Sequence, residues 1–149
     1  MTMANATELK FGDPATRIAQ TERWSVLLRP RQPTLGSLVL VCREPVLAFG
    51  ACSAEAYAEL RTVVAKVEEV LRAFVAYERI NYLMLMMVDP DVHFHVLPRY
   101  PGARTCRGIE FPDKGWPGPP VLEPAVALDD ATRDALVGEL RQAWQRPGA

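Results

Sequence analysis

The sequence has little histidine, no long apolar run and almost no net charge. Only two of its 149 residues are histidines, and its three cysteines, Cys42, Cys52 and Cys106, have no CxxC spacing. We therefore expect free thiols in a reducing cytoplasm. The formal net charge of −1 provides no overall positive field, so generic nucleic-acid binding is not expected. A local arginine cluster could still bind a small anion.

Nothing in the chain suggests a membrane or secreted protein. The longest strongly apolar run, 80–88, is interrupted by Asn81 and is far too short to cross a bilayer. The first residues contain no apolar signal region, so export is not expected. A chain of 149 residues can form one compact domain with a real core, and we predict a single domain over 1–149.

Apolar patterns predict a sheet and one long helix in the first two thirds of the chain. Residues 24–29 and 37–43 are rich in leucine and β-branched residues, and the Pro- and Gly-containing stretch between them predicts a hairpin. Ser53 is a suitable N-cap for a helix that reaches about Tyr77. One apolar face of this helix should pack on the sheet, although a coiled-coil or dimer face is an alternative. That face comprises Tyr57, Leu60, Val64, Val67, Leu71 and Phe74.

The second half of the chain predicts a further hairpin, a wrapping segment and a last helix. The run 80–88 is apolar on both faces, which predicts a strand in the centre of the sheet. A tight turn at 89–91 and an alternating strand at 92–97 would complete an antiparallel hairpin. The segment 98–124 holds seven of the thirteen prolines and should wrap the domain irregularly, anchored by Phe111 and Trp116. A capped helix is expected over about 129–145.

Both histidines fall in one alternating stretch, "DVHFHVL". On a strand, residues two apart share a face and lie roughly 6.6 Å apart, so Asp91, His93 and His95 should point the same way. A row of titratable groups is costly to bury unless it lines a cleft. One neutral imidazole could act as a nucleophile and the other as a general acid, while Asp91 orients a neighbouring ring.

Two other interpretations of the histidines stay open. They could be partly exposed residues of an ordinary amphipathic strand, or they could share a zinc ion. Zinc would need a third ligand, and Asp91 lies roughly 13 Å from His95 along an extended strand. We therefore predict no metal site, and we place a metal-dependent hydrolase third.

The stretch "DVHFHVLPRY" resembles the signature of the histidine triad (HIT) family. "LLRPRQPTLGSLVLVCREPV", the long helix and the "INYL" strand are similar to the family's elements in the same order, so the resemblance covers about residues 20–100. The chain is most similar to a bacterial subgroup with "NYLMLMMVDP" before the motif. The resemblance implies an α+β fold: about five antiparallel strands, with the long helix and a C-terminal helix packed on them. It also implies a homodimer.

The resemblance further implies a nucleotide hydrolase or nucleotidyl transferase that acts at the α-phosphate. Substrates would be of the diadenosine polyphosphate or nucleoside phosphoramidate type. His93 would attack phosphorus and form a nucleotidyl-histidine, and His95 would protonate the leaving group. No cofactor is expected to be required, although a divalent cation could accompany the nucleotide. A non-catalytic nucleotide-binding module is the alternative.

The sequence departs from the family pattern around the motif. Asp91 occupies the first triad position, where the family has a histidine that supports the other two, and the 88–91 turn is shorter than in most relatives. Arg29 falls about where relatives have a ribose-binding Asn or Asp. We expect Arg29, Asn81 and Arg99 to contact the nucleotide, with surface or structural roles as alternatives.

Overall fold

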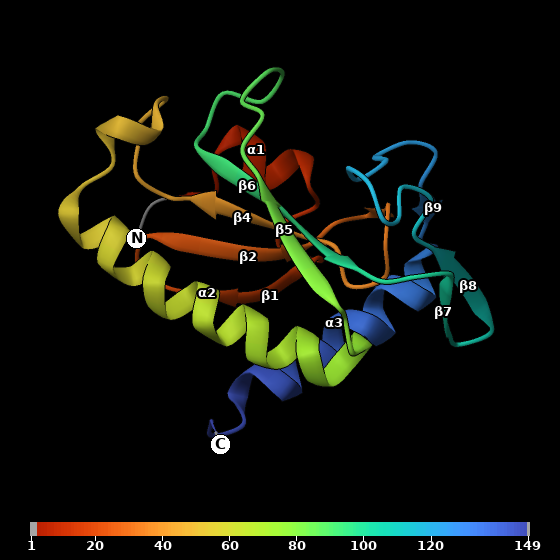
Figure 1. Cartoon of the computed structure of the whole chain (residues 1–149). Helices are drawn as coiled ribbons and strands as arrows, with labels where there is room; N and C mark the ends of the chain where they lie inside the picture. The colour runs from red at the N-terminus through yellow and green to blue at the C-terminus, as the bar shows by residue number, and fades with distance from the viewer. Residues whose placement is uncertain (1–2, 149) are drawn as a thin grey trace.

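The computed structural model describes residues 3–148 and contains a five-stranded antiparallel sheet with helices on both faces (Figure 1). This architecture confirms the predicted α+β class. The strand order is β1 (Arg17–Gln20), β2 (Trp24–Leu28), β4 (Leu38–Cys42), β6 (His93–Arg99) and β5 (Arg79–Leu83). Two short ribbons lie outside this sheet and pair β3 (Arg31–Gln32) with β9 (Val126–Ala127) and β7 (Ala103–Cys106) with β8 (Ile109–Pro112).

Two capped helices cover one face of the sheet. The side chain of Ser53 accepts a hydrogen bond at the start of α2 (Ala54–Val75), and Asp129 does the same for α3 (Asp130–Gln145). A short 3-10 turn, η1 (Phe49–Ala51), precedes α2. The buried face of α2 differs slightly from the predicted apolar face, since Tyr57 is 40 % exposed. The buried residues of α2 are Ala56, Val63, Val67, Val70, Leu71 and Val75.

The prediction of a central strand over 80–88 is wrong. β5 ends at Leu83 and lies at the edge of the sheet, beside β6 alone. The chain then leaves the sheet through Met86, whose φ is +52°, and Met87 and Val88 are 84 % and 81 % exposed. A continuous apolar run does not reveal whether its residues are buried, so the sequence of 80–88 could not distinguish a central strand from an edge strand followed by a loop. The β5–β6 connection is consequently longer than the predicted 89–91 turn.

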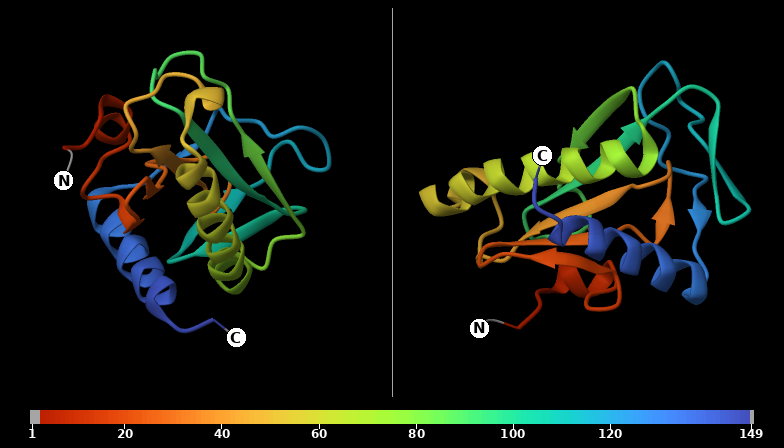
Figure 2. Two further views of the ribbon diagram at one scale, coloured as in Figure 1. Left: turned by 90° about the vertical axis from the view of Figure 1, so that its left-hand side faces the viewer. Right: turned by 90° about the horizontal axis from the view of Figure 1, so that it is seen from below.

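A short N-terminal helix packs on the opposite face of the sheet from α2 and α3 (Figure 2). This helix, α1 (Ala6–Lys10), begins with a capping box in which Asn5 and Glu8 exchange hydrogen bonds. Its following residue, Phe11, packs against Leu27 and Val39 on that face. Neither α1 nor β1 is among the predicted elements, although the Asn5-x-x-Glu8 spacing is a recognisable helix-start signal.

A buried ion pair ties the proline-rich segment to β6. The guanidinium of Arg99 donates two hydrogen bonds to Asp113, at 2.7 and 3.1 Å, and both side chains are at most 4 % exposed. The guanidinium also donates to the backbone carbonyl of Gly118 at 2.9 Å. Phe111, one of the two predicted aromatic anchors, is 1 % exposed. The segment is therefore ordered against the sheet, and part of it forms the β7–β8 ribbon.

We predict that Arg99→Met destabilises the fold by about 3–5 kcal/mol, because Asp113 would remain charged and buried without its partner. Urea unfolding measures the loss. Arg31→Met is the matched control, because the ion pair between Arg31 and Glu123 is more than half exposed and should contribute little to the free energy of unfolding. Equal losses in the two variants would contradict this account.

Candidate active site

The register of β6 places the two histidines together on the face covered by α1. His93 is opposite Val41 of β4, and His95 is opposite Val39. Their ring centroids are 5.2 Å apart, and the ring planes meet at 81°. The alternate residues, Phe94 and Val96, belong to the core on the other side of the sheet. The structure therefore brings His93 and His95 together, as the strand pattern predicts.

The hydrogen bond of His93 indicates which ring nitrogen is available for chemistry. Its Nδ1 lies 2.7 Å from the backbone carbonyl oxygen of Asp91. A carbonyl only accepts hydrogen bonds, so Nδ1 carries the proton and donates it. In the neutral ring the lone pair then resides on Nε2. This is the tautomer that a nucleophilic imidazole needs.

The carboxylate of Asp91 bonds to α1 and not to an imidazole. One of its oxygens accepts from the backbone N–H of Thr7 at 3.1 Å and from the Thr7 hydroxyl at 2.9 Å. The expectation that this carboxylate orients a neighbouring ring is thus not met. Asp91 instead orients His93 through its backbone carbonyl.

The N-terminal segment, residues 5–11, covers both imidazoles. The Phe11 ring centroid lies 6.2 Å from that of His93 and 5.7 Å from that of His95. His93 is 2 % exposed and His95 is 7 % exposed. Three further contacts hold the segment: Asn5 to the Cys42 carbonyl, Glu8 to the Ser25 hydroxyl, and Lys10 to Asp89. Sequence reasoning did not identify Thr7, Lys10 or Phe11 as site residues.

Burial keeps His95 neutral at physiological pH. Loss of hydration is the main cause that lowers the pKa of His95 to about 4, and electrostatic interactions with Arg29 and the neighbouring His93 lower it further. Its Nδ1 is buried without a hydrogen-bond partner in the structure. Near neutral pH the ring of His95 is therefore uncharged, and a negative charge brought close to it would favour the protonated form.

A hollow of about 370 Å³ opens beside His95. Of the three predicted nucleotide-binding residues, only Arg29 lines it. Asn81 accepts a 2.7 Å hydrogen bond from Arg99, and both residues line a separate hollow of about 460 Å³ beside Trp116. The walls of the first hollow are Lys10, Phe11, Arg29, Pro30, Arg31, Leu85, Val88, Asp89, His95 and Leu122.

Within residues 3–148, metal-ligating side chains cluster at Cys42, Glu44 and Cys52, whose donor atoms lie within 4.8 Å of one another, and not at the histidines. The Glu44 carboxylate already accepts from Ser53 and Arg23. Burial raises the pKa of the Cys42 thiol to about 12, which disfavours the thiolate that metals bind. This cluster is a weak candidate for a metal centre.

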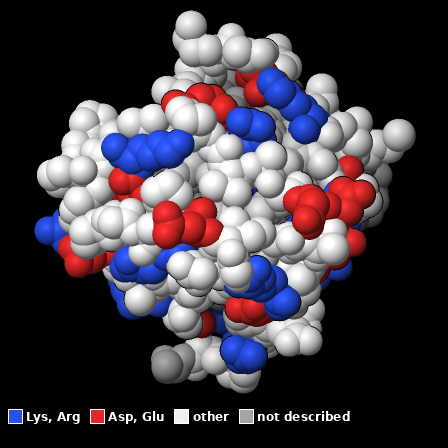
Figure 3. All heavy atoms as spheres, turned by 90° about the vertical axis from the view of Figure 1, so that its right-hand side faces the viewer, with Lys and Arg blue, Asp and Glu red and all other residues white. Residues whose placement is uncertain are grey.

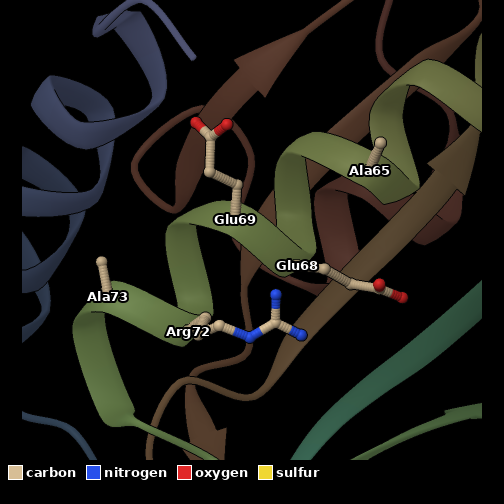
Figure 4. Close-up of a pocket in the computed structure, with 5 residues that line it drawn as sticks. All are labelled: Ala65, Glu68, Glu69, Arg72 and Ala73. Atoms are coloured by element: carbon tan, nitrogen blue, oxygen red, sulfur yellow. The ribbon is translucent and has the colours of Figure 1, made fainter. Parts of the chain in front are cut away.

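Other surfaces are less distinctive. On the face that carries the β7–β8 ribbon, basic and acidic side chains are interspersed (Figure 3). A hollow of about 530 Å³ lies along α2, where Glu68 and Arg72 project to the same side of the helix (Figure 4). Among the described helices, none combines the length and the apolar character that crossing a membrane requires.

Comparison with solved structures identifies the class of fold. A histidine triad protein from Sinorhizobium meliloti 1021 matches with a TM-score of 0.73 at 19 % identity, over 95 % of this chain and 96 % of that chain. One from Bradyrhizobium japonicum gives 0.71 at 19 % identity, with the same coverage. A hypothetical histidine triad nucleotide-binding protein from Sulfolobus tokodaii strain 7 gives 0.64 at 16 % identity, over 87 % and 83 % of the two chains.

The chain therefore has the histidine triad fold, and the resemblance carried by the "DVHFHVLPRY" motif holds at the level of the fold. The first two matches cover 95 % of this chain and so extend well beyond residues 20–100. No protein-family model matches the sequence, and no curated protein does so significantly.

We predict that Phe11→Ala increases the rate at which diethyl pyrocarbonate modifies His93 and His95 by at least about tenfold, because the ring that covers both imidazoles is removed. Peptide mass spectrometry gives the rate at each histidine. Leu9→Ala, on α1 two positions before Phe11 but 59 % exposed, is the control and should leave both rates unchanged. Equal rates in all three proteins would show that Phe11 does not control access.

We predict that His95 makes the fold less stable as the pH falls from about 6.5 to about 4. The unfolded chain takes up a proton near pH 6.5, whereas the folded chain resists protonation down to about pH 4. The loss is on the order of 3 kcal/mol across this window and is absent above it. Urea unfolding at pH 7, 6 and 5 should show a steeper decline for the unsubstituted protein than for His95→Gln. An NMR pKa near 6.5 for His95 would contradict the prediction.

Proposed function

We propose that this protein is a nucleotide hydrolase or nucleotidyl transferase that acts at an α-phosphate through a nucleotidyl-histidine. The observation that carries the proposal is the adjacent pair of imidazoles, 5.2 Å apart, in which His93 donates through Nδ1 and so has its lone pair on Nε2. A histidine triad protein named as nucleotide-binding shares the fold, which supports the same ligand class. Diadenosine polyphosphates and nucleoside phosphoramidates are the proposed substrates.

The reaction would proceed in two displacements at phosphorus. The Nε2 lone pair of His93 attacks the α-phosphorus, and the bond from phosphorus to the leaving group breaks. His95 gives a proton to the leaving oxygen or nitrogen. Water then attacks the nucleotidyl-histidine, returns a proton to His95 and releases the nucleoside monophosphate. Replacement of water by another acceptor makes the same protein a transferase.

His95 would become protonated when the substrate binds. The free site keeps this imidazole neutral, but a phosphate placed beside it favours the imidazolium form. Nucleotide binding and protonation of His95 are thereby coupled. The general acid would be charged only when there is a leaving group to protonate.

Nucleotide binding without chemistry is a second candidate. The 2 % exposure of His93 favours it, because the segment 5–11 would have to shift before phosphorus could reach Nε2. A bound nucleotide recovered intact, with no adduct on His93, would select this function. A metal-dependent hydrolase stays third, because the Asp91 carboxylate is already bonded to Thr7.

The homodimer and the cytoplasmic location remain predictions. β5 has one neighbour in the sheet, so its outer backbone groups could pair with a second copy of the chain. The Tyr82 hydroxyl of β5 also donates a 2.6 Å hydrogen bond to Glu68 of α2, which holds this edge against the helix.

We predict that His93→Ala abolishes release of AMP from adenosine phosphoramidate and diadenosine tetraphosphate, with a loss of at least about 10³-fold, because no other group forms the covalent intermediate. Liquid chromatography measures AMP, and intact-protein mass spectrometry detects the adduct.

His95→Asn should slow turnover by about 10²–10⁴-fold but still allow the adduct to form. Arg61→Gln, an exposed change on α2, is the control and should behave like the unsubstituted protein. Full activity in His93→Ala, or no turnover of any nucleotide by the unsubstituted protein, would refute the proposal.

A further inference from the structure

The hollow beside His95 concentrates positive charge from three separate segments. Lys10 lies on α1, Arg29 directly follows β2, and Arg31 opens β3. Two of these cations have acidic partners: Lys10 is 2.9 Å from Asp89, and Arg31 is 2.8 Å from Glu123. The third positive charge forms no ion pair within residues 3–148.

That charge belongs to Arg29. Across residues 3–148, Arg29 forms no ion pair, and its Nη1 donates only to the backbone carbonyl of Arg31, at 2.5 Å. Its Nε is buried with no hydrogen-bond partner. Burial lowers the pKa of Arg29, and the charge of Glu123, which is bonded to Arg31, partly opposes this shift. The guanidinium stays charged at any physiological pH.

An unpaired, partly desolvated guanidinium is unfavourable for folding. Such a group is stabilised when a ligand supplies the missing anion, and the fork of an arginine suits a phosphate in particular. The hollow also has apolar walls, among them Phe11, Leu85 and Leu122, and its volume of about 370 Å³ is within the range of small-molecule sites.

The phosphate expected at Arg29 is not the reacting one. The proposed nucleophile, His93, does not line this hollow, whereas the proposed acid, His95, does. A ligand that extends from His93 past His95 into the hollow would bring a different group to Arg29.

We propose that the hollow beside His95 selects nucleotides that carry a second phosphate group, which Arg29 binds. The inference rests on the proposed nucleotide function and specifies its substrate class. The second phosphate could lie on the leaving group, as in a 5′-diphosphate, or on the nucleoside, as in a 3′,5′-bisphosphate. Both present the same chemistry to Arg29.

Calorimetry with AMP, ADP and adenosine 3′,5′-bisphosphate tests the proposal, with chromatography to verify that each ligand is recovered intact. We expect at least one of the two doubly phosphorylated ligands to bind about 10–100-fold more tightly than AMP, since a charge-assisted hydrogen bond contributes on this scale. If ADP binds more tightly, the second phosphate lies on the leaving group. If adenosine 3′,5′-bisphosphate binds more tightly, it lies on the nucleoside.

Arg29→Gln should remove this advantage, so that the doubly phosphorylated ligands bind within about threefold of AMP in that variant, and Arg29→Lys should restore part of the advantage. Arg61→Gln removes the same charge from an exposed site and should keep the advantage. Equal affinities for all three ligands, or an advantage that survives in Arg29→Gln, would overturn the inference.

The outcome is separable from that of the enzymatic proposal. Preferential binding without AMP release from either adenosine phosphoramidate or diadenosine tetraphosphate would refute hydrolysis and retain the second-phosphate site. Turnover without the binding preference would refute the second-phosphate site and retain hydrolysis. A chain that binds none of the three nucleotides would overturn both proposals.

Discussion

The antiparallel pairing of β6 with β4 is the interaction on which the candidate site depends, because it sets the side on which each histidine emerges. With His93 opposite Val41 and His95 opposite Val39, Phe94 and Val96 are directed into the core beneath α2. A slip of one residue would exchange the two sets and bury both imidazoles in that core. Burial of the apolar alternates therefore holds the imidazoles side by side on the other face.

The same pairing explains why the site is dry. The imidazoles rest beside valines of β4 and beneath Phe11, so water is largely excluded from both rings. Such surroundings favour the uncharged form of His95. The acid role proposed for His95 requires a proton. In the proposed mechanism, the negative charge of a ligand would therefore promote protonation of His95 as well as binding.

Local patterns predicted the parts of the fold that follow from local physics. The caps at Ser53 and Asp129, the β2–β4 hairpin and the shared face of His93 and His95 all depend on residues close in sequence. The position of β5 does not, because an apolar run is compatible with a central strand, an edge strand or a loop. The cover over the imidazoles was missed for a related reason. The Asn5–Glu8 capping box could have indicated a helix, but its contact with Asp91 joins residues 84 positions apart.

The arginines show how a residue's role depends on distant partners. Arg29, Arg31 and Arg99 all lie at or beside strand ends, and nothing in their immediate neighbours ranks them as ligand contacts. The fold brings Asp113 to Arg99 and Glu123 to Arg31, across 14 and 92 positions of sequence, and each carboxylate neutralises its guanidinium. No carboxylate pairs with Arg29 within the described chain. The fold thus supplies an ion-pair partner to Arg31 and Arg99 but not to Arg29, and this difference is what favours a ligand contact at Arg29.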